Sequence, residues 1–146
     1  ELNLINPEHE HRSHLCHNNS KKFESAFLGL SIPQNKSILL GSLSNSKLGI
    51  WVAHGEGRFY LPEPEDHYNV VAKYNYAEYP GNPNGSDYNV AGICSNDGRH
   101  LAMMPHPERA IFPWQNAYYP LDRKNDEVTP WIEAFVNARK WIEEKR

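Results

Sequence analysis

The chain has 146 residues, of which 39% are hydrophobic and 12% aromatic, enough for a core and too much for a disordered chain. The net charge of −3, with Lys and Arg scattered along the sequence, argues against nucleic acid as a partner. No apolar run approaches the roughly 18 residues that cross a bilayer, and no signal peptide is recognisable, so we expect no membrane partner and a cytoplasmic location. Two cysteines, Cys16 and Cys94, make no disulfide framework.

The first half of the chain is expected to form strands separated by turns. Residues 1–5 read as the end of a helix stopped by Asn6-Pro7, as though the sequence begins inside a domain. A short helix or turn is expected over 37–43, and a short strand near Leu15. Apolar runs and alternating patterns predict strands over 23–32, 48–53, 59–61 and 70–76. In the last of these, alternation puts Val70, Ala72, Tyr74 and Tyr76 on one side and Val71, Lys73 and Asn75 on the other.

The second half contains the clearest hairpin, followed by a single helix. Residues 90–94 and 99–104 flank an Asp-Gly turn, which is typical of a β-hairpin. Thr129 and Pro130 are expected to be the N-cap and first residue of the C-terminal helix. Helical spacing predicts that one face of this helix packs on the sheet: Ile132, Phe135, Val136, Arg139 and Ile142. The order of elements predicts a mixed α/β domain.

The most informative stretch is His106-Pro107-Glu108. A proline fixes its own φ and restricts the residue before it, so the prolines at 105 and 107 stiffen the backbone around His106. In an extended conformation the side chains of His106 and Glu108 lie on one side. Glu108 would then bind one ring nitrogen of His106 and leave the other free to act as a base for a nucleophile. A rigid turn with a surface His and Glu is the alternative on spacing alone.

Two further clusters each have a functional and a structural interpretation. Five potential zinc ligands fall within nine residues, at His9, His11, His14, Cys16 and His17, although their spacing fits no standard zinc finger and a solvated polar loop explains them equally well. An aromatic run is expected either to pack beneath a long loop or to anchor an interface: Phe112, Trp114, Tyr118 and Tyr119.

Several segments, taken in series, resemble one family. They are N-N-S-K-K-F-E-S at 18–25, H-G-E-G at 54–57, N-P-N-G-S at 82–86, M-M-P-H-P-E-R at 103–109, and P-W with N-A-R-K at 130–131 and 137–140. In this order they resemble the C-terminal part of the class I glutamine amidotransferase domain of phosphoribosylformylglycinamidine synthases. The last pair of segments looks like the long, single-chain form; a free-standing small-subunit glutaminase is the alternative.

The resemblance implies a flavodoxin-like α/β fold with three layers, whose sheet is largely parallel with antiparallel additions. It implies a Cys-His-Glu triad that hydrolyses glutamine, with His106 and Glu108 as two of its members. His54, Gly55 and Glu56 would lie near the glutamine pocket and shape it or contact the synthase. The implied partners are glutamine and a synthase domain of the same polypeptide, and ATP and magnesium would belong to that domain, with no cofactor or metal in residues 1–146.

The chain departs from the family in lacking the G-V-C-N-G type of elbow that carries the nucleophile. Cys94 imitates an elbow, but the Asp97-Gly98 turn after it predicts a hairpin, so we expect a buried structural thiol. Cys16 is no better placed. We therefore expect no glutaminase activity from these 146 residues alone. An uncovered edge of the sheet also predicts self-association of the chain.

Overall fold

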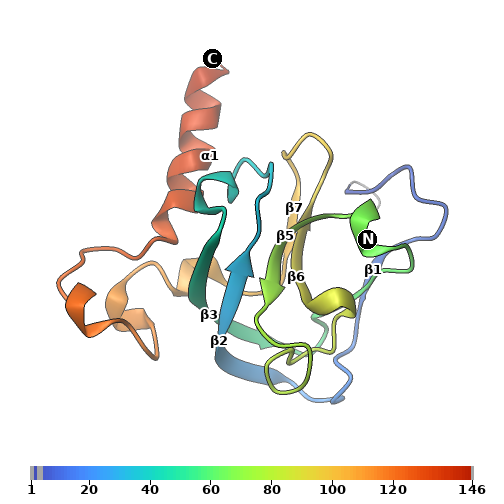
Figure 1. Ribbon diagram of the computed structural model, residues 1–146, viewed down its shortest axis with the longest axis horizontal. Helices are drawn as coiled ribbons and strands as arrows, with labels where there is room; N and C mark the ends of the chain where they lie inside the picture. The colour runs from blue at the N-terminus through green and yellow to red at the C-terminus, as the bar shows by residue number, and fades with distance from the viewer. Residues whose placement is uncertain (1, 3–4, 146) are drawn as a thin grey trace.

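A curled five-stranded sheet with one C-terminal helix forms the fold in the computed structural model, which describes residues 2 and 5–145 (Figure 1). The sheet has the order β3-β2-β5-β6-β7. Its strands are β2 (Glu24–Ile32), β3 (Ser46–His54), β5 (Asn69–Tyr74), β6 (Val90–Cys94) and β7 (Leu101–Met103). A separate two-stranded ribbon joins β1 (His14–Cys16) to β4 (Arg58–Tyr60). The helix α1 spans Ile132–Glu144. The strands predicted from sequence are thus confirmed, whereas the helix end expected over residues 1–5 falls mostly outside the described residues.

Every strand pairing in the described part of the chain is antiparallel. The parallel pairings implied by the family resemblance are therefore not formed among these strands. The α/β class, the hairpin of β6 and β7, and the terminal helix are as expected. The longest pairing joins β2 and β3 over nine residues each, from Glu24 opposite His54 to Ile32 opposite Ser46. This hairpin carries His54 to the end of the sheet.

The alternation expected for β5 is wrong at its centre. The pairing of β5 with β6 shifts register between Val70 and Ala72 and again between Ala72 and Lys73. Such an irregularity disrupts the two-residue period of a strand. Val71, Ala72 and Tyr74 consequently all belong to one buried cluster, although the pattern assigns Val71 to the opposite side.

The helix also differs from its prediction, in its first residue and in its buried face. The α-helix starts at Ile132, two residues after the predicted first residue Pro130. A preceding turn is closed by the Ile132 N–H, which donates to the Thr129 carbonyl. Thr129 Oγ1 accepts the Trp131 N–H at 3.3 Å and donates to the Ala110 carbonyl, so it caps a preceding turn. Phe135 and Ile142, expected inside, are 42% and 50% exposed.

The residues that face inward are instead Trp131, which immediately precedes the helix, and Ala134 within it, with Asn137 following them. Asn137 donates to the Leu39 carbonyl and to Ser42, because the helix leans against the turn η1 (Gly41–Leu43) instead of lying along the sheet. In Figure 1 only the first turn of α1 approaches the sheet, and the rest projects beyond it.

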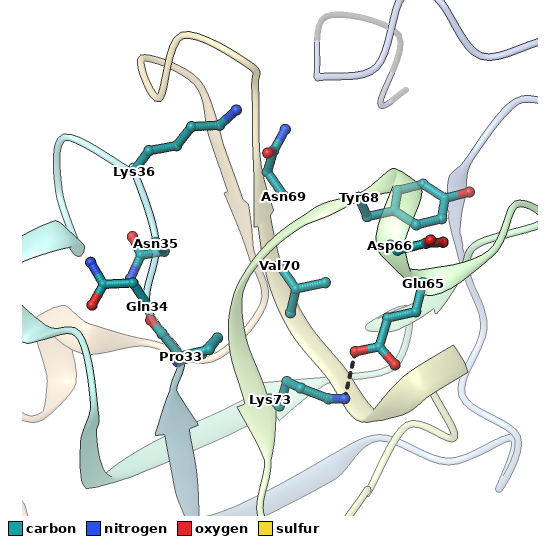
Figure 2. Close-up of a pocket in the computed structure, with 10 residues that line it drawn as sticks. All are labelled: Pro33, Gln34, Asn35, Lys36, Glu65, Asp66, Tyr68, Asn69, Val70 and Lys73. Carbon is teal, nitrogen blue, oxygen red and sulfur yellow. Dashed lines mark hydrogen bonds and ion pairs between the residues drawn. The ribbon is translucent and has the colours of Figure 1, made fainter.

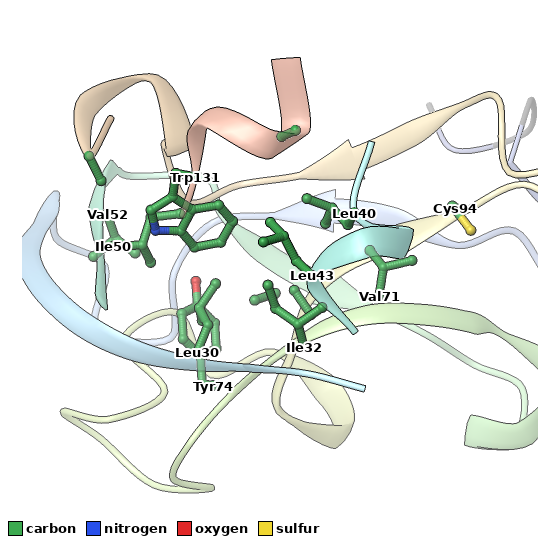
Figure 3. Packing of buried hydrophobic residues seen from close by; sticks show 14 residues of the cluster. Leu30, Ile32, Leu40, Leu43, Ile50, Val52, Val71, Tyr74, Cys94 and Trp131 are labelled. Carbon is green, nitrogen blue, oxygen red and sulfur yellow. The ribbon is translucent and has the colours of Figure 1, made fainter. Parts of the chain in front are cut away.

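The main core lies between β2, β3, β5 and the residues that cover them (Figure 3). Trp131 is 1% exposed and its Nε1 donates to the Gly49 carbonyl at 2.8 Å, which fixes the start of α1 against β3. The core is completed by Leu30, Ile32, Leu40, Leu43, Ile50, Val52, Val71 and Tyr74. A second buried cluster, including Phe59, Leu61 and Ile93, packs beneath β4. No helix in the described ranges is long and apolar enough to span a bilayer.

Candidate active site

His106 and Glu108 are hydrogen-bonded, as their spacing predicts. His106 Nδ1 lies 2.8 Å from Glu108 Oε1. Since a carboxylate only accepts, Nδ1 carries a proton, and in the neutral ring Nε2 holds the lone pair. Nε2 makes no hydrogen bond to a described residue. The pair therefore has the arrangement of a base and the group that orients it.

The backbone brings this pair together differently from the expected extended strand. His106 follows the end of β7 and donates its N–H to the Trp51 carbonyl at 2.9 Å, forming a single bridge to β3. Pro107 then begins a 3-10 turn, η4 (Pro107–Arg109), so that Glu108 folds back toward the ring. Pro107 suits the first position of such a turn because its missing N–H is not needed there.

His54 lies beside His106, at the end of β3. The two ring centroids are 6.3 Å apart. His54 continues the core-facing row of Ile50 and Val52, and it is 7% exposed. Burial lowers the pKa of His54; the hydrogen bond that its ring donates to Asn84 acts in the opposite direction, and His106 lowers the pKa further. His54 is therefore a neutral imidazole at pH 7.

A buried network of polar side chains holds His54. Its Nε2 lies 2.9 Å from Asn84 Oδ1, which also accepts the Tyr74 hydroxyl at 2.9 Å. Asn84 Nδ2 donates to Asn18 Oδ1 at 2.6 Å, and Asn18 Nδ2 donates back to the His54 carbonyl at 2.7 Å. Asn18 Oδ1 also accepts the N–H of Gly57. Burial raises the pKa of Tyr74, which keeps its hydroxyl a donor.

Asn18 and Asn84 support the site, although their positions in the sequence predict no role for them. Tyr74 was expected only as a strand residue. The two asparagines are 66 residues apart in the chain, and both are buried to at least 99%. A signal existed in the sequence, because both stand in segments that match the family.

The other two residues of the predicted glutamine-binding loop lie apart from the His106–Glu108 pair. The Gly55 carbonyl accepts the Asn18 N–H at 2.9 Å. The Glu56 side chain is exposed and lies 3.3 Å from His17 Nδ1. Of the three predicted residues, the structure brings only the His54 side chain next to His106.

Cys94 lacks the features of a nucleophile. Cys94 is fully buried in β6, and burial raises the pKa of its thiol. A raised pKa disfavours the thiolate that attacks carbonyl groups. Cys16 lies in β1, on the ribbon with β4.

The zinc interpretation of the N-terminal cluster finds no support. Within residues 2 and 5–145, no three His, Cys, Asp or Glu side chains are placed to hold a metal ion. The histidines engage separate partners: His11 pairs with Glu63, His17 lies near Glu56, His9 packs on Tyr68, and His14 packs on Tyr60.

The structure also contains a large cavity of about 750 Å³ (Figure 2). It separates the loop that begins at Pro33 from the 3-10 turn that carries Glu65, with Lys73 bonded to Glu65 at 2.7 Å between them. His54, His106 and Glu108 are not among the residues that line it. It therefore does not enlarge the candidate active site.

The aromatic run after the pair is split between packing and exposure. Phe112 and Trp114 stack with centroids 5.9 Å apart, but Trp114 is 79% exposed. Tyr118 is also exposed, whereas Tyr119 donates to Asp126 at 2.7 Å. The loop is attached to the sheet by Trp51 Nε1, which donates to the Gln115 carbonyl at 2.7 Å. The prediction of packing beneath a loop thus fails for Trp114 and Tyr118.

Relatives of this chain align with most of its length. The probable phosphoribosylformylglycinamidine synthase, chloroplastic/mitochondrial, of Arabidopsis thaliana is 44% identical over 141 residues, which cover 87% of this chain and 10% of the relative. The phosphoribosylformylglycinamidine synthase of Homo sapiens is 40% identical over 139 residues, with the same two shares. The chain thus spans about a tenth of the length of these curated relatives.

Structure and family agree with this similarity. The structure described as that of PurLQS from Thermotoga maritima matches 90% of this chain and 54% of the other, with a TM-score of 0.67 and 25% identity. The sequence pattern of the CobB/CobQ-like glutamine amidotransferase domain matches residues 1–142. The chain therefore belongs to the family of CobB/CobQ-like glutamine amidotransferase domains.

Proposed function

We propose that this chain is part of a glutaminase domain that supplies ammonia for the ATP-dependent conversion of formylglycinamide ribonucleotide to its amidine, in purine biosynthesis. The observation that carries the proposal is the 2.8 Å hydrogen bond between His106 and Glu108 in a chain of this family. Glutamine is the substrate, and a synthase domain of the same polypeptide is the partner. ATP and magnesium bind to that domain, and the protein resides in the cytoplasm.

In this mechanism His106 moves protons and Glu108 stabilises the charge. A cysteine from outside these 146 residues gives its proton to His106 Nε2, and its sulfur attacks the carboxamide carbon of glutamine. The imidazolium at His106 is stabilised by Glu108, then protonates the leaving nitrogen, and ammonia departs. A water molecule that gives a proton to His106 Nε2 then hydrolyses the thioester and releases glutamate. His54 lies beside this pair and would border the bound glutamine.

The long, single-chain form is favoured over a free-standing small subunit. The relatives named above are proteins of which this chain spans about a tenth, so their catalytic domains share one polypeptide with much other sequence. A small-subunit glutaminase would instead be a protein little longer than the domain itself.

The test compares two nitrogen sources in a full-length synthase that carries this segment. We expect His106→Asn and Glu108→Gln to lower glutamine-dependent synthesis, the former by at least about 10²-fold, as for loss of a general acid–base group. Synthesis with ammonium chloride should be unchanged, because it bypasses the glutaminase. Glu127→Gln is the matched control, since Glu127 is exposed and carries the same change of charge. Full glutamine-dependent synthesis by His106→Asn would refute the proposal.

A further inference from the structure

Asn84 is buried, makes hydrogen bonds through both ends of its side chain, and is separated from His106 only by His54. Its Oδ1 faces His54 Nε2 and the Tyr74 hydroxyl, and its Nδ2 faces Asn18 Oδ1. These hydrogen bonds determine the positions of the oxygen and the nitrogen in the Asn84 side-chain amide. Because Asn18 Oδ1 can only accept, the atom of Asn84 near it is the nitrogen, and the atom near His54 is the oxygen.

The fixed amide in turn fixes the proton on His54. An amide oxygen is an acceptor, so the Nε2 atom that faces it must carry the hydrogen, and Nδ1 then holds a lone pair. Nδ1 is buried and has no hydrogen-bond partner among the described residues. An imidazolium would have an N–H at that position, buried without an acceptor, which is costly. The surroundings of His54 are therefore built for the neutral ring.

We propose that Asn84 is a positioning residue of the glutaminase: it places the ring proton of His54 on Nε2, and because the buried Nδ1 then has no acceptor for a second proton, His106 is the one imidazole of this pair that changes charge during the reaction. The inference rests on the proposed function for its catalytic part. Its structural part, the tautomer of His54, stands on the hydrogen bonds alone.

The charge of His54 matters because of its distance from His106. The ring centroids are 6.3 Å apart. At an effective dielectric constant of about 20, two positive charges at this separation disfavour each other by a factor on the order of tenfold to a hundredfold. A protonated His54 would thus oppose the imidazolium that His106 becomes when it accepts the thiol proton.

No other described group near His54 forms a hydrogen bond to its ring in place of Asn84. Glu24 is the register partner of His54 across β2 and β3, and its Oε1 is buried without a partner. It makes no hydrogen bond to His54. Tyr74 reaches His54 only through Asn84, and Glu108 only through His106. Direct hydrogen bonding to the ring comes from Asn84.

The first test reads the tautomer directly, by two-bond ¹H–¹⁵N correlation spectra of the histidine-labelled 146-residue chain. At pH 6.0 an ordinary histidine is mostly protonated. We expect His54 to keep a larger neutral fraction at that pH than the exposed histidines of the chain, with its proton on Nε2. A ring as protonated as the exposed histidines, or a neutral ring with its proton on Nδ1, would overturn the inference. This outcome does not depend on whether the domain hydrolyses glutamine, and it requires no variant to fold.

The second test is Asn84→Asp in the full-length synthase. A carboxylate at this position favours the imidazolium of His54, so we expect kcat/KM for glutamine to fall about tenfold at pH 6.5 and to recover by pH 8.5. The same substitution in a His54→Gln background has no ring to protonate, and its loss should not vary with pH. A loss that is independent of pH and equal in both backgrounds would reduce Asn84 to a purely structural residue.

The two failures are distinguishable. If His106→Asn retains glutamine-dependent synthesis, the proposed function fails, whatever the spectra show. If His106→Asn abolishes that synthesis and Asn84→Asp leaves the pH profile unchanged, the function stands and the positioning role fails. Ammonium-dependent synthesis reports in each case that the synthase itself is intact.

Discussion

Gly57 is the position where the smallest change should do the most damage to the site. It is buried, and its side chain position is already occupied. A Cβ atom built on Gly57 would lie 2.1 Å from Cδ2 of His54 and 2.9 Å from Nδ2 of Asn84. Non-bonded carbon atoms pack at about 3.5–4.0 Å, so Gly57→Ala requires His54 or the loop to move by more than 1 Å.

The cost follows from what such a movement breaks. Inserting a methyl group into a packed region costs about 1–3 kcal/mol. A displaced His54 also loses the hydrogen bond to Asn84, and a shifted loop loses the 3.1 Å bond from the Gly57 N–H to Asn18. An unsatisfied buried group costs about 1–3 kcal/mol. We therefore expect Gly57→Ala to lower the free energy of unfolding by about 2–6 kcal/mol.

Gly55→Ala supplies the matched control. It lies two residues earlier in the same loop, and a Cβ atom there meets nothing within 4 Å. Both variants replace a glycine whose φ lies outside the left-handed region, so their backbone effects are similar. Urea unfolding of the 146-residue chain should separate the two by at least about 2 kcal/mol. Equal midpoints would refute the steric argument, and with it the close packing of Gly57 on His54.

Three further outcomes test other parts of the structure. Burial lowers the pKa of His54, so the unfolded chain binds a proton before the folded chain does as the pH falls below about 6.5, and the free energy of unfolding decreases with pH. The free energy of unfolding of His54→Gln should vary less over this range. Parallel curves of unfolding free energy against pH for the two proteins would contradict this assignment. Trp131→Phe loses the hydrogen bond to the Gly49 carbonyl and should lower the free energy of unfolding in urea by about 1–3 kcal/mol. An unchanged midpoint would show that this hydrogen bond does not stabilise the fold. Cys94→Ala should leave glutamine-dependent synthesis by the full-length enzyme within twofold of wild type, because its buried thiol is not the nucleophile; a folded variant that lost the activity would reverse that assignment.

The parts of the fold that sequence predicts well are those determined locally. The Asp97-Gly98 turn specifies the hairpin of β6 and β7, with Gly98 at a φ of 72°. Pro33 follows the last residue of β2. The pair of His106 and Glu108 is likewise local, since two residues and two prolines determine its geometry. Local chemistry decides such features, so the pattern carries enough information.

The face of α1 shows where a local pattern fails. Phe135 and Ile142 form an apolar stripe by helical spacing, yet they are exposed, while Ala134 and Asn137 face inward. The orientation of the helix is determined by Trp131, whose indole is fixed to Gly49, 82 residues away in the chain. Periodicity states that a helix has an apolar side; it does not state which neighbour the helix meets.

The same limit applies with more force to the site around His54. Its three supporting side chains come from separate segments: Asn18 precedes β2, Tyr74 ends β5, and Asn84 stands in a turn cluster. Each alone reads as an ordinary surface asparagine or a strand tyrosine. Their role arises because buried amides must satisfy every donor and acceptor, and in doing so they fix each other's orientation. The position of the ring proton of His54 is thus determined by Asn18 through Asn84, and burial favours the neutral ring. The protonation of a candidate site is therefore a property of the fold and not of its motif.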